Sequence, residues 1–599
     1  MKHSYIRNLL YGVSLLWTCS PKRVICIALG EIISYFEWLF YSVYFMRYII
    51  ESMEQGLSFE KLTGMVLLFA AVFCTLGVYG SYYRTSVIVL TDTVIHQNVY
   101  AKLYTKAANV ELECYENPEF YSKYTMAING AAEKLIACTT SFFEIIFGVV
   151  ASAIAFYAIL SIDPWMGLFV LAPLLGNFLF GRIQAKINYR RDMDDVKNVR
   201  KAAYVNRVMY LSDYAKEIRH TNIYQLMMDK YSKATGDSMR VIKHHATKAS
   251  WSMWFRNILT FHIFFEGVTC YAAFRCMVSG SIGLGDLTII FSAMTATSWI
   301  MIGLFESVNA AMQNGVMVGY LKNFMEYEAK IPEDQDGILP NTQIDSIEFR
   351  DVSFAYQEGK PMISHVSFRV EGAKTVALVG HNGAGKTTLI KLLLRLYDPT
   401  EGEILLNGVN ITEYNLKAYR DLFGVAFQDY KMMAFSLREN ILMGNRPNDE
   451  TQVVNRALQK AGVYERVQKF EKGLDANLTK EFDAAGEALS GGETQKIVVA
   501  RAFSKEAGIL LFDEPSSALD PIAEYELYES IRKERGGHMV FFISHRLSSV
   551  KDSDVVWMLQ NGEIIESGTH ETLMRQNGVY ADMYRKQAVN YLALEEEGA

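Results

Sequence analysis

Six long apolar segments dominate the first half of this 599-residue chain and limit how that half can fold. A helix that crosses lipid needs about 20 mostly apolar residues, and only structures that satisfy their own backbone polar groups can cross it. The sequence therefore predicts an α-helical bundle of six transmembrane spans over residues 21–326. The spans are expected at about 22–50, 62–90, 135–160, 164–190, 250–278 and 287–315.

The segment before the first span, residues 1–20, is apolar with a few polar breaks and ends at Pro21. This pattern predicts an amphipathic helix that lies in the membrane interface. The connections 96–134 and 182–248 are long and rich in Lys and Arg, whereas residues 51–61 are acidic. Because basic connections stay on the cytoplasmic side, both termini are expected in the cytoplasm.

The basic connections have helical spacing rather than loop composition. Between Gly181 and Gly236 there is no glycine or proline, and apolar residues recur every three or four positions. Helices of this length would extend beyond a hydrocarbon core of about 30 Å. Two short aromatic segments, 114–121 and 218–224, interrupt them. Taken alone, each is either a segment that runs across the bundle or an ordinary helix–helix corner.

The second half of the chain has the mixed polarity of a soluble α/β domain. Pro332, Gly337 and Pro340 mark a linker at 327–343, and the predicted nucleotide-binding domain occupies 344–599. The net charge of −7 shows no basic face of the kind that nucleic acid requires. All seven cysteines lie in the membrane-like half without metal-ligand spacing, so we interpret them as reduced, small apolar residues.

A phosphate-binding loop follows the apolar strand 375–379. The sequence G-x-x-x-x-G-K-T lies between that strand and a helical pattern at 389–394, which is the context expected of a P-loop. Its glycines let successive N–H groups point at an anion. Lys386 would reach the terminal phosphates of ATP, and the Thr387 hydroxyl would hold Mg²⁺. The full predicted loop comprises Gly380, His381, Asn382, Gly383, Ala384, Gly385, Lys386, Thr387 and Thr388.

Three further sequence clusters supply the groups for hydrolysis. The strand 509–512 ends in Asp513, expected to hold Mg²⁺ through water, and Glu514, expected to polarise an attacking water. His545 follows the strand 540–543 and would sense the γ-phosphate. Gln428 follows 424–427, where a mobile loop could contact both metal and phosphate.

A second anion site is predicted at Leu489–Glu493. Ser490, Gly491, Gly492 and Glu493 precede a helical run, so bare N–H groups and a serine hydroxyl are available to an anion. One chain has no need of two such phosphate sites. The pattern therefore predicts that a nucleotide is sandwiched between two copies.

Taken together, these motifs resemble those of half-transporters of the ATP-binding cassette exporter family, in the same order and over nearly the whole chain. The resemblance implies alternating access in a bacterial cytoplasmic membrane, surrounded by lipid. A homodimer is expected, and a heterodimer with another half-transporter stays open. The resemblance also implies that Tyr356 stacks on adenine, that 517–520 crosses the dimer interface, and that the two aromatic segments are coupling helices near Gln428.

Two positions depart from the family pattern. The signature has Glu493 where glutamine is usual, which we expect to be tolerated. Just before the signature, Ala484 and Ala485 stand where exporters usually carry two charged residues, so transmission to the coupling helices is expected to differ.

Charged residues in or near the predicted spans bear on the nature of the cargo. Glu144, Glu266 and Glu306 lie in or near predicted spans, together with Arg84, Arg256 and His262. Intramembrane charges usually face a cavity or a partner. They indicate either an acidic cavity for a hydrophobic or amphipathic peptide or drug, or mutual pairing inside the bundle. A lipid flippase and an ATP-gated channel or sensor are the alternative functions.

Overall fold

A computed structural model describes residues 4–357, 359–533 and 537–596. The ends of the predicted domains, residues 1–3 and 597–599, therefore lie outside the described part. The chain divides into two compact units. The first comprises residues up to Lys106 together with Glu119–Tyr327, and the second comprises Ala107–Pro118 together with the chain from Glu328 onward.

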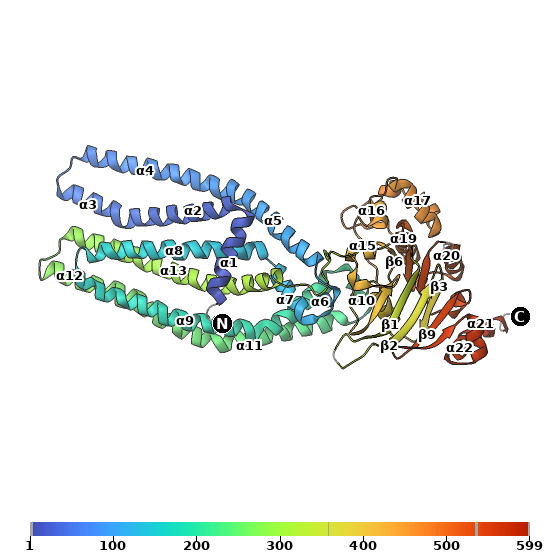
Figure 1. Cartoon of the computed structure of the whole chain (residues 1–599). Helices are drawn as coiled ribbons and strands as arrows, with labels where there is room; N and C mark the ends of the chain where they lie inside the picture. Colours follow the sequence, from blue (N-terminus) through green and yellow to red (C-terminus); the bar gives the residue numbers. More distant parts are fainter. Residues whose placement is uncertain (1–3, 358, 534–536, 597–599) are drawn as a thin grey trace. The chain divides into compact units, whose positions relative to one another are not determined.

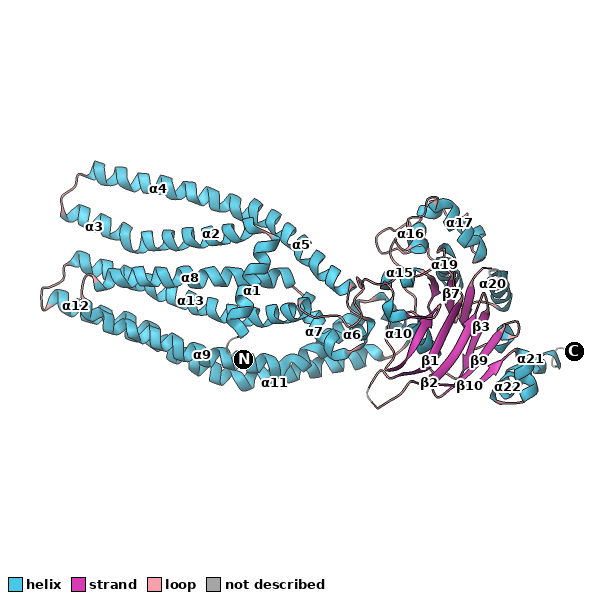
Figure 2. Cartoon of the chain, viewed as in Figure 1, coloured by secondary structure: helices cyan, strands magenta, loops and turns pink. Residues whose placement is uncertain are grey.

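The described residues of the first unit form helices joined by short loops (Figures 1 and 2). Its elements are α1 (Ser4–Cys19), α2 (Pro21–Leu39), the π-helical η1 (Phe40–Phe45), α3 (Met46–Glu54), α4 (Phe59–Tyr82), the π-helical η2 (Tyr83–Val87), α5 (Ile88–Ala108), α7 (Pro118–Ile128), α8 (Ala131–Leu160), η3 (Pro164–Met166), α9 (Gly167–Tyr210), η4 (Ser212–Tyr214), α10 (Ala215–His220), α11 (Ile223–Asn257), the π-helical η5 (Ile258–Glu266), α12 (Gly267–Met277) and α13 (Leu284–Met325).

Long antiparallel pairs form the framework of this unit. In Figure 1, α8 runs beside α13, and α9 runs beside α11. A cluster of buried residues from α2, η1, α8, η3, η5, α12 and α13 forms an apolar core in this unit. The 44 residues of α9 extend for about 66 Å at 1.5 Å per residue, which exceeds a hydrocarbon core of about 30 Å. The long helices expected from the spacing are thus confirmed.

Five helical segments of the described chain are long and apolar enough to cross a membrane: Pro21–Glu54, Phe59–Ala108, Ala131–Leu160, Pro164–Tyr210 and Gly285–Met325. They correspond to five of the six predicted spans. The segment predicted at 250–278 is helical as expected, in α11, η5 and α12, but it is not among the five. It carries the polar His262 and Glu266, and its role as a sixth span stays a prediction.

The second unit contains two sheets. Its elements are α6 (Leu112–Glu116), β1 (Ser346–Phe354), β2 (Ile363–Glu371), β3 (Thr375–Gly380), α14 (Lys386–Leu393), β4 (Glu401–Leu406), β5 (Val409–Asn410), η6 (Ile411–Glu413), α15 (Leu416–Asp421), β6 (Phe423–Ala426), α16 (Leu437–Leu442), α17 (Glu450–Lys460), α18 (Tyr464–Val467), η7 (Gly473–Asp475), α19 (Gly491–Ser504), β7 (Ile509–Asp513), α20 (Pro521–Lys533), β8 (Met539–Ile543), η9 (Leu547–Val550), β9 (Val555–Gln560), β10 (Glu563–Gly568), α21 (His570–Gln576) and α22 (Val579–Glu596).

The larger sheet determines where the chemistry can lie. Its strand order is β10-β9-β3-β8-β7-β6, and β3, β8, β7, β6 and β9 run parallel, with β10 added antiparallel. Every residue of β3, β7 and β8 is buried, as continuous apolar runs predict for strands covered on both faces. Ligands of such sheets bind beyond the carboxyl ends of the strands. The residues that follow β3, β7 and β8 are the predicted site residues.

Gly380, the last residue of β3, has a backbone conformation that requires glycine. Its φ is +149°, and a Cβ atom there would lie 2.2 Å from the carbonyl oxygen of Leu559 on the neighbouring strand β9. No side-chain rearrangement can relieve a contact with backbone.

We therefore expect Gly380→Ala to destabilise the second unit by about 1–3 kcal/mol through backbone strain, with a lower midpoint of thermal unfolding in detergent. Gly537→Ala is the matched control, because a Cβ atom at Gly537 meets nothing within 4 Å. Equal midpoints for the two variants would contradict this account of the loop.

Candidate functional site

The phosphate-loop lysine lies inside the loop that it belongs to. Lys386 is only 6% exposed, and its Nζ donates hydrogen bonds to the carbonyl oxygens of Gly380 at 2.8 Å and His381 at 3.0 Å. Burial lowers the pKa of Lys386, while the nearby carboxylates of Glu514 and Asp513 raise it. The ammonium group is thus positioned in front of the N-terminus of α14, where an anion would be held.

The two oxygen groups proposed for a metal lie together. The Thr387 hydroxyl donates to Oδ2 of Asp513 at 3.0 Å. Asp513 is 3% exposed, and its Oδ1 has no hydrogen-bond partner within the described chain. Burial raises the pKa of Asp513 to about 6, against the lowering effect of the Thr387 hydrogen bond.

A hard cation fits this pair of oxygen groups. The unpartnered, buried Oδ1 and the Thr387 hydroxyl are oxygen donors of the kind that Mg²⁺ binds together with substrate phosphates and water. Elsewhere in the described residues, no group of three or more His, Cys, Asp or Glu side chains could hold a metal ion. The donor set therefore suits a cation that completes its shell with phosphate rather than a closed protein cage.

Glu514 lies at the centre of the predicted catalytic residues. Its Oε2 accepts a hydrogen bond from Nε2 of Gln428 at 2.9 Å, and its Oε1 pairs with Nε2 of His545. The residue has a φ of +49°, which is unusual for a side chain of this kind. The structure thus brings together three residues that follow the parallel strands β6, β7 and β8: Gln428, Glu514 and His545.

Gln495 is a buried site residue that the sequence analysis missed. Its Nε2 donates to the backbone oxygen of Glu514 at 2.9 Å and to Oγ of Ser517 at 3.0 Å, and its Oε1 accepts from the backbone N–H of Ala518 at 2.8 Å. It is 3% exposed. One side chain of α19 therefore holds the segment from Glu514 to Ala518, and its only sequence signal is a polar residue in an apolar helical run.

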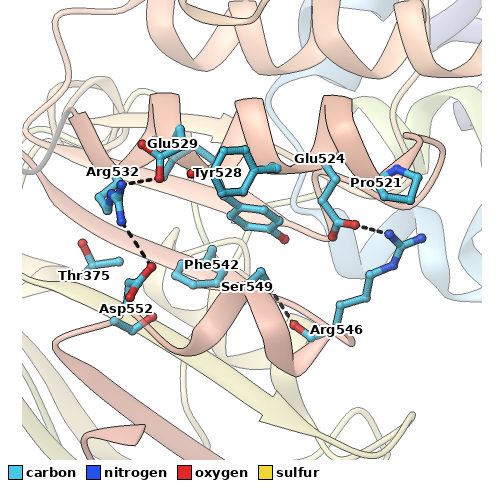
Figure 3. A pocket seen from close by; sticks show the side chains of 13 residues that line it. Thr375, Pro521, Glu524, Tyr528, Glu529, Arg532, Phe542, Arg546, Ser549 and Asp552 are labelled. Atoms are coloured by element: carbon cyan, nitrogen blue, oxygen red, sulfur yellow. Dashed lines mark hydrogen bonds and ion pairs between the residues drawn. The ribbon is translucent and has the colours of Figure 1, made fainter. Parts of the chain in front are cut away.

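His545 and the residue that follows it are held by contacts with distant parts of the chain. Its backbone oxygen accepts from Nε2 of Gln587 at 2.8 Å. The next residue, Arg546, forms an ion pair with Glu524 on α20. Figure 3 shows this pair beside a hollow of about 340 Å³, with Arg532 of the same helix pairing with Asp552 at 3.2 Å. These pairs join α20, which follows the predicted dimer-crossing loop, to the segment that carries His545.

Ser490 and Glu493 form the N-terminal cap of α19. The Ser490 hydroxyl accepts from the backbone N–H of Glu493 at 3.2 Å, and the Glu493 carboxylate accepts from the backbone N–H of Ser490 at 2.8 Å. Arg466 also donates to Glu493 at 2.9 Å. The backbone hydrogen bond from Ser490 lowers the pKa of Glu493, with help from Arg466. Because Glu and Gln close this capping box equally well, the departure at 493 has a structural explanation.

Tyr356 lies at the edge of the phosphate-loop helix. Its ring packs edge-on against Phe354 and Tyr397, at 4.9 and 5.2 Å between centroids, and its hydroxyl lies 3.2 Å from that of Thr388. The ring is 38% exposed. An exposed aromatic face next to Thr388 is available for a base to stack on.

Part of the first predicted coupling segment belongs to the second unit. In α6, Glu116 accepts a hydrogen bond from Nζ of Lys391 at 2.8 Å and another from the hydroxyl of Tyr397. Lys391 also lies 5.5 Å from the ring centre of Tyr356. Burial tends to raise the pKa of Glu116, but the hydrogen bonds from Lys391 and Tyr397 outweigh it and lower the value. Glu116 is therefore linked to the Tyr356 ring through one lysine.

Comparison with known proteins identifies the family. The family model described as "ABC transporter" matches residues 363–517. The subtilin transport ATP-binding protein SpaT of Bacillus subtilis is 30% identical over 523 residues, which cover 83% of this chain and 81% of that protein. The chain belongs to the ABC transporter family. As a family member, it couples ATP hydrolysis to export across a membrane that it crosses several times.

Two further similarities agree with this assignment. The ATP-dependent lipid A-core flippase of Alcanivorax borkumensis is 34% identical over 306 residues, or 50% of this chain and about half, 52%, of the flippase. A solved structure described as a bacterial Atm1-family ABC exporter with ATP bound has a TM-score of 0.72 at 21% identity. It covers 94% of this chain and 97% of that one, and shows the same exporter fold.

The contacts of Gln495 lead to the second prediction. Gln495→Ala removes the bonds that position Glu514 and Ser517, so we expect ATP turnover to fall by about 10- to 100-fold with nucleotide affinity nearly unchanged. Gln452→Ala, at an exposed position on α17, is the control and should keep full turnover. A Gln495→Ala transporter with normal steady-state ATPase activity would show that the segment needs no such support.

Proposed function

We propose that this ABC transporter works as a pair of half-transporters that close around two ATP molecules and export a hydrophobic or amphipathic substrate, a peptide or a drug-like molecule. The observation that carries the proposal is the placement of Glu514. Its carboxylate is held by Gln428 and His545 next to the phosphate loop, which is the arrangement that an in-line attack by water on a γ-phosphate requires.

The phosphate loop and the residues around it have separate roles in this proposal. Lys386 exchanges its two carbonyl contacts for phosphate oxygens, while the N–H groups of residues 381–388 surround the rest of the triphosphate. Thr387 and Asp513 would hold Mg²⁺, which would supply positive charge opposite the phosphates. Tyr356 stacks on the adenine ring. Glu514 accepts a proton from the attacking water, and His545 and Gln428 keep its carboxylate oriented.

The second copy completes the site from the opposite side. The N-terminus of the 14-residue α19, with Ser490 as its cap, presents N–H groups to an anion. In a head-to-tail pair, that end faces the γ-phosphate bound to the partner's loop. Closure is then stabilised only while the γ-phosphate is present, so hydrolysis releases the pair. A homodimer is sufficient, because one chain carries every predicted site residue.

The coupling route from the nucleotide to the membrane helices is proposed to pass through Glu116. Ala484 and Ala485 lack the charges that the family usually has before the signature. Glu116, in contrast, is bonded to Lys391 and Tyr397 in the layer that contains Tyr356. A shift of Tyr356 when adenine binds would therefore move α6, which leads directly into α7 of the helical unit.

A lipid flippase is the second candidate function, because the curated relatives include lipid A-core flippases. The two candidates separate in proteoliposomes that contain ATP. Accumulation of an added labelled peptide or drug-like cation in inside-out vesicles supports export. Movement of a labelled lipid between leaflets without such accumulation supports the flippase. Ion conductance without turnover would support the channel or sensor.

The third prediction concerns the carboxylate at 514. Glu514→Gln should lower ATP turnover by about 100-fold or more yet retain ATP binding and favour the closed dimer. Lys386→Ala should instead weaken ATP binding itself, because the Nζ charge is lost. Turnover by steady-state phosphate release and binding by a fluorescent ATP analogue check both. Wild-type turnover in Glu514→Gln would mean that another group activates the water.

The fourth prediction tests the coupling route. Glu116→Gln should retain basal ATPase activity, because it leaves the loop and Glu514 intact, but should reduce substrate-stimulated transport by about tenfold. The control is Glu119→Gln, whose exposed carboxylate pairs with the neighbouring Lys123 in the i,i+4 position at 2.7 Å. Normal transport by Glu116→Gln would place the coupling route elsewhere.

A further inference from the structure

A hollow of about 540 Å³ lies in the helical unit, with α2 and η1 on one side and α13 on the other. Residues spaced three and four apart on α2 and η1, Ser34, Glu37, Trp38 and Tyr41, form one wall. Trp299 and Gly303, one turn apart on α13, form the other. Its volume is in the range of sites for small ligands, about 300–1,000 Å³.

Glu37 is the charged group of this hollow. It lies in the segment Pro21–Glu54, which is apolar enough to cross a membrane, and its side chain is exposed. Within the described chain, its carboxylate takes part in no hydrogen bond or ion pair. An ionised carboxylate at membrane depth is costly and usually marks a ligand path.

The carboxylates that the sequence analysis singled out differ from Glu37. Glu144 accepts a hydrogen bond from the hydroxyl of Ser307 at 2.7 Å, and Glu266 pairs with Nδ1 of His262 at 2.8 Å. Glu144 and Glu266 therefore have partners inside the bundle, which was the alternative to an acidic cavity. Their partners are serine and histidine rather than arginine. Glu306 is exposed but does not line the hollow.

Aromatic rings make up most of the remaining wall. Trp38, Tyr41 and Trp299 are 45%, 39% and 55% exposed, and Tyr35 lines the same space. A cation is attracted to the face of a Trp or Tyr ring, most strongly when water is excluded. Rings around a single carboxylate therefore favour a positively charged group on an apolar body over a neutral or anionic one.

Two backbone features occur in the walls of this hollow. A Cβ atom at Gly303 would meet nothing within 4 Å, so the glycine leaves room that a side chain would fill. Tyr41 and Ser42 belong to the π-helical segment η1, and π-helical turns are frequent at functional sites. The carbonyl of Ser42 accepts a hydrogen bond from the hydroxyl of Ser292 on α13, which ties the two walls together.

We propose that this hollow binds the cationic group of the exported molecule, with Glu37 as its counter-charge and Trp38, Tyr41 and Trp299 around it. The inference rests on the proposed export of amphipathic substrates and narrows them to lipophilic organic cations. A cation on an apolar body satisfies both the carboxylate and the rings, whereas a neutral lipid tail leaves the carboxylate unpaired.

The test compares two probes of the same shape and opposite charge, tetraphenylphosphonium and tetraphenylborate, on the purified full-length transporter. The wild type should bind the cation saturably and the anion at least about tenfold more weakly. Glu37→Gln should weaken binding of the cation by about tenfold. Glu51→Gln is the control, since Glu51 lies in the same helical segment, Pro21–Glu54, but pairs with Arg47 at 2.6 Å. It should bind the cation as the wild type does.

Gly303→Phe adds an independent arm, because a ring there fills the hollow without changing its charge. It should abolish saturable binding of the cation. The inference is overturned if the wild type shows no saturable binding, as when a second protomer or lipid covers the hollow, or if Glu37→Gln binds normally. The proposed function is tested separately. If the wild type still transports other substrates, and Glu514→Gln stops that transport, the proposed function stands even though this inference fails.

Discussion

The carboxylate of Glu514 is the constraint around which the nucleotide unit is built. The residue follows a fully buried strand and has a positive φ, a conformation that costs of order 1–3 kcal/mol and persists only when its surroundings enforce it. Those surroundings are Gln428 and His545 at the side chain and Gln495 at the backbone oxygen. Each comes from a different element, so the parallel sheet and α19 must both form before the carboxylate is correctly placed.

Local signals made the nucleotide site readable from sequence. The phosphate loop joins β3 to α14, as predicted, because glycine spacing and flanking apolar runs act over a dozen residues. Asp513 and Glu514 follow a buried strand for the same reason. Their meeting with Gln428 and His545 was also predictable, since the carboxyl ends of parallel strands share one edge of a sheet.

Features that depend on contacts between distant segments could not be predicted. Gln495 is one polar residue in a helix, and its role appears only when α19 packs against the segment after Glu514. The bonds of Glu116 to Lys391 and Tyr397 span some 280 positions. The π-helical turn at Phe40–Phe45 has no local sequence signature. Glu37 did have a signal, a charge within a predicted span, but only packing distinguishes it from carboxylates that have partners.

The central claim is that two copies close on shared ATP. It is tested most directly by the distance between two spin labels, one on each protomer. The labels are attached at position 469, where Lys469 is exposed, by Lys469→Cys in a transporter that carries Glu514→Gln and no other cysteine. The account predicts a broad distance distribution without nucleotide that shortens and narrows when ATP and Mg²⁺ are added. A distribution that ATP leaves unchanged, in protein shown to bind ATP, would contradict it.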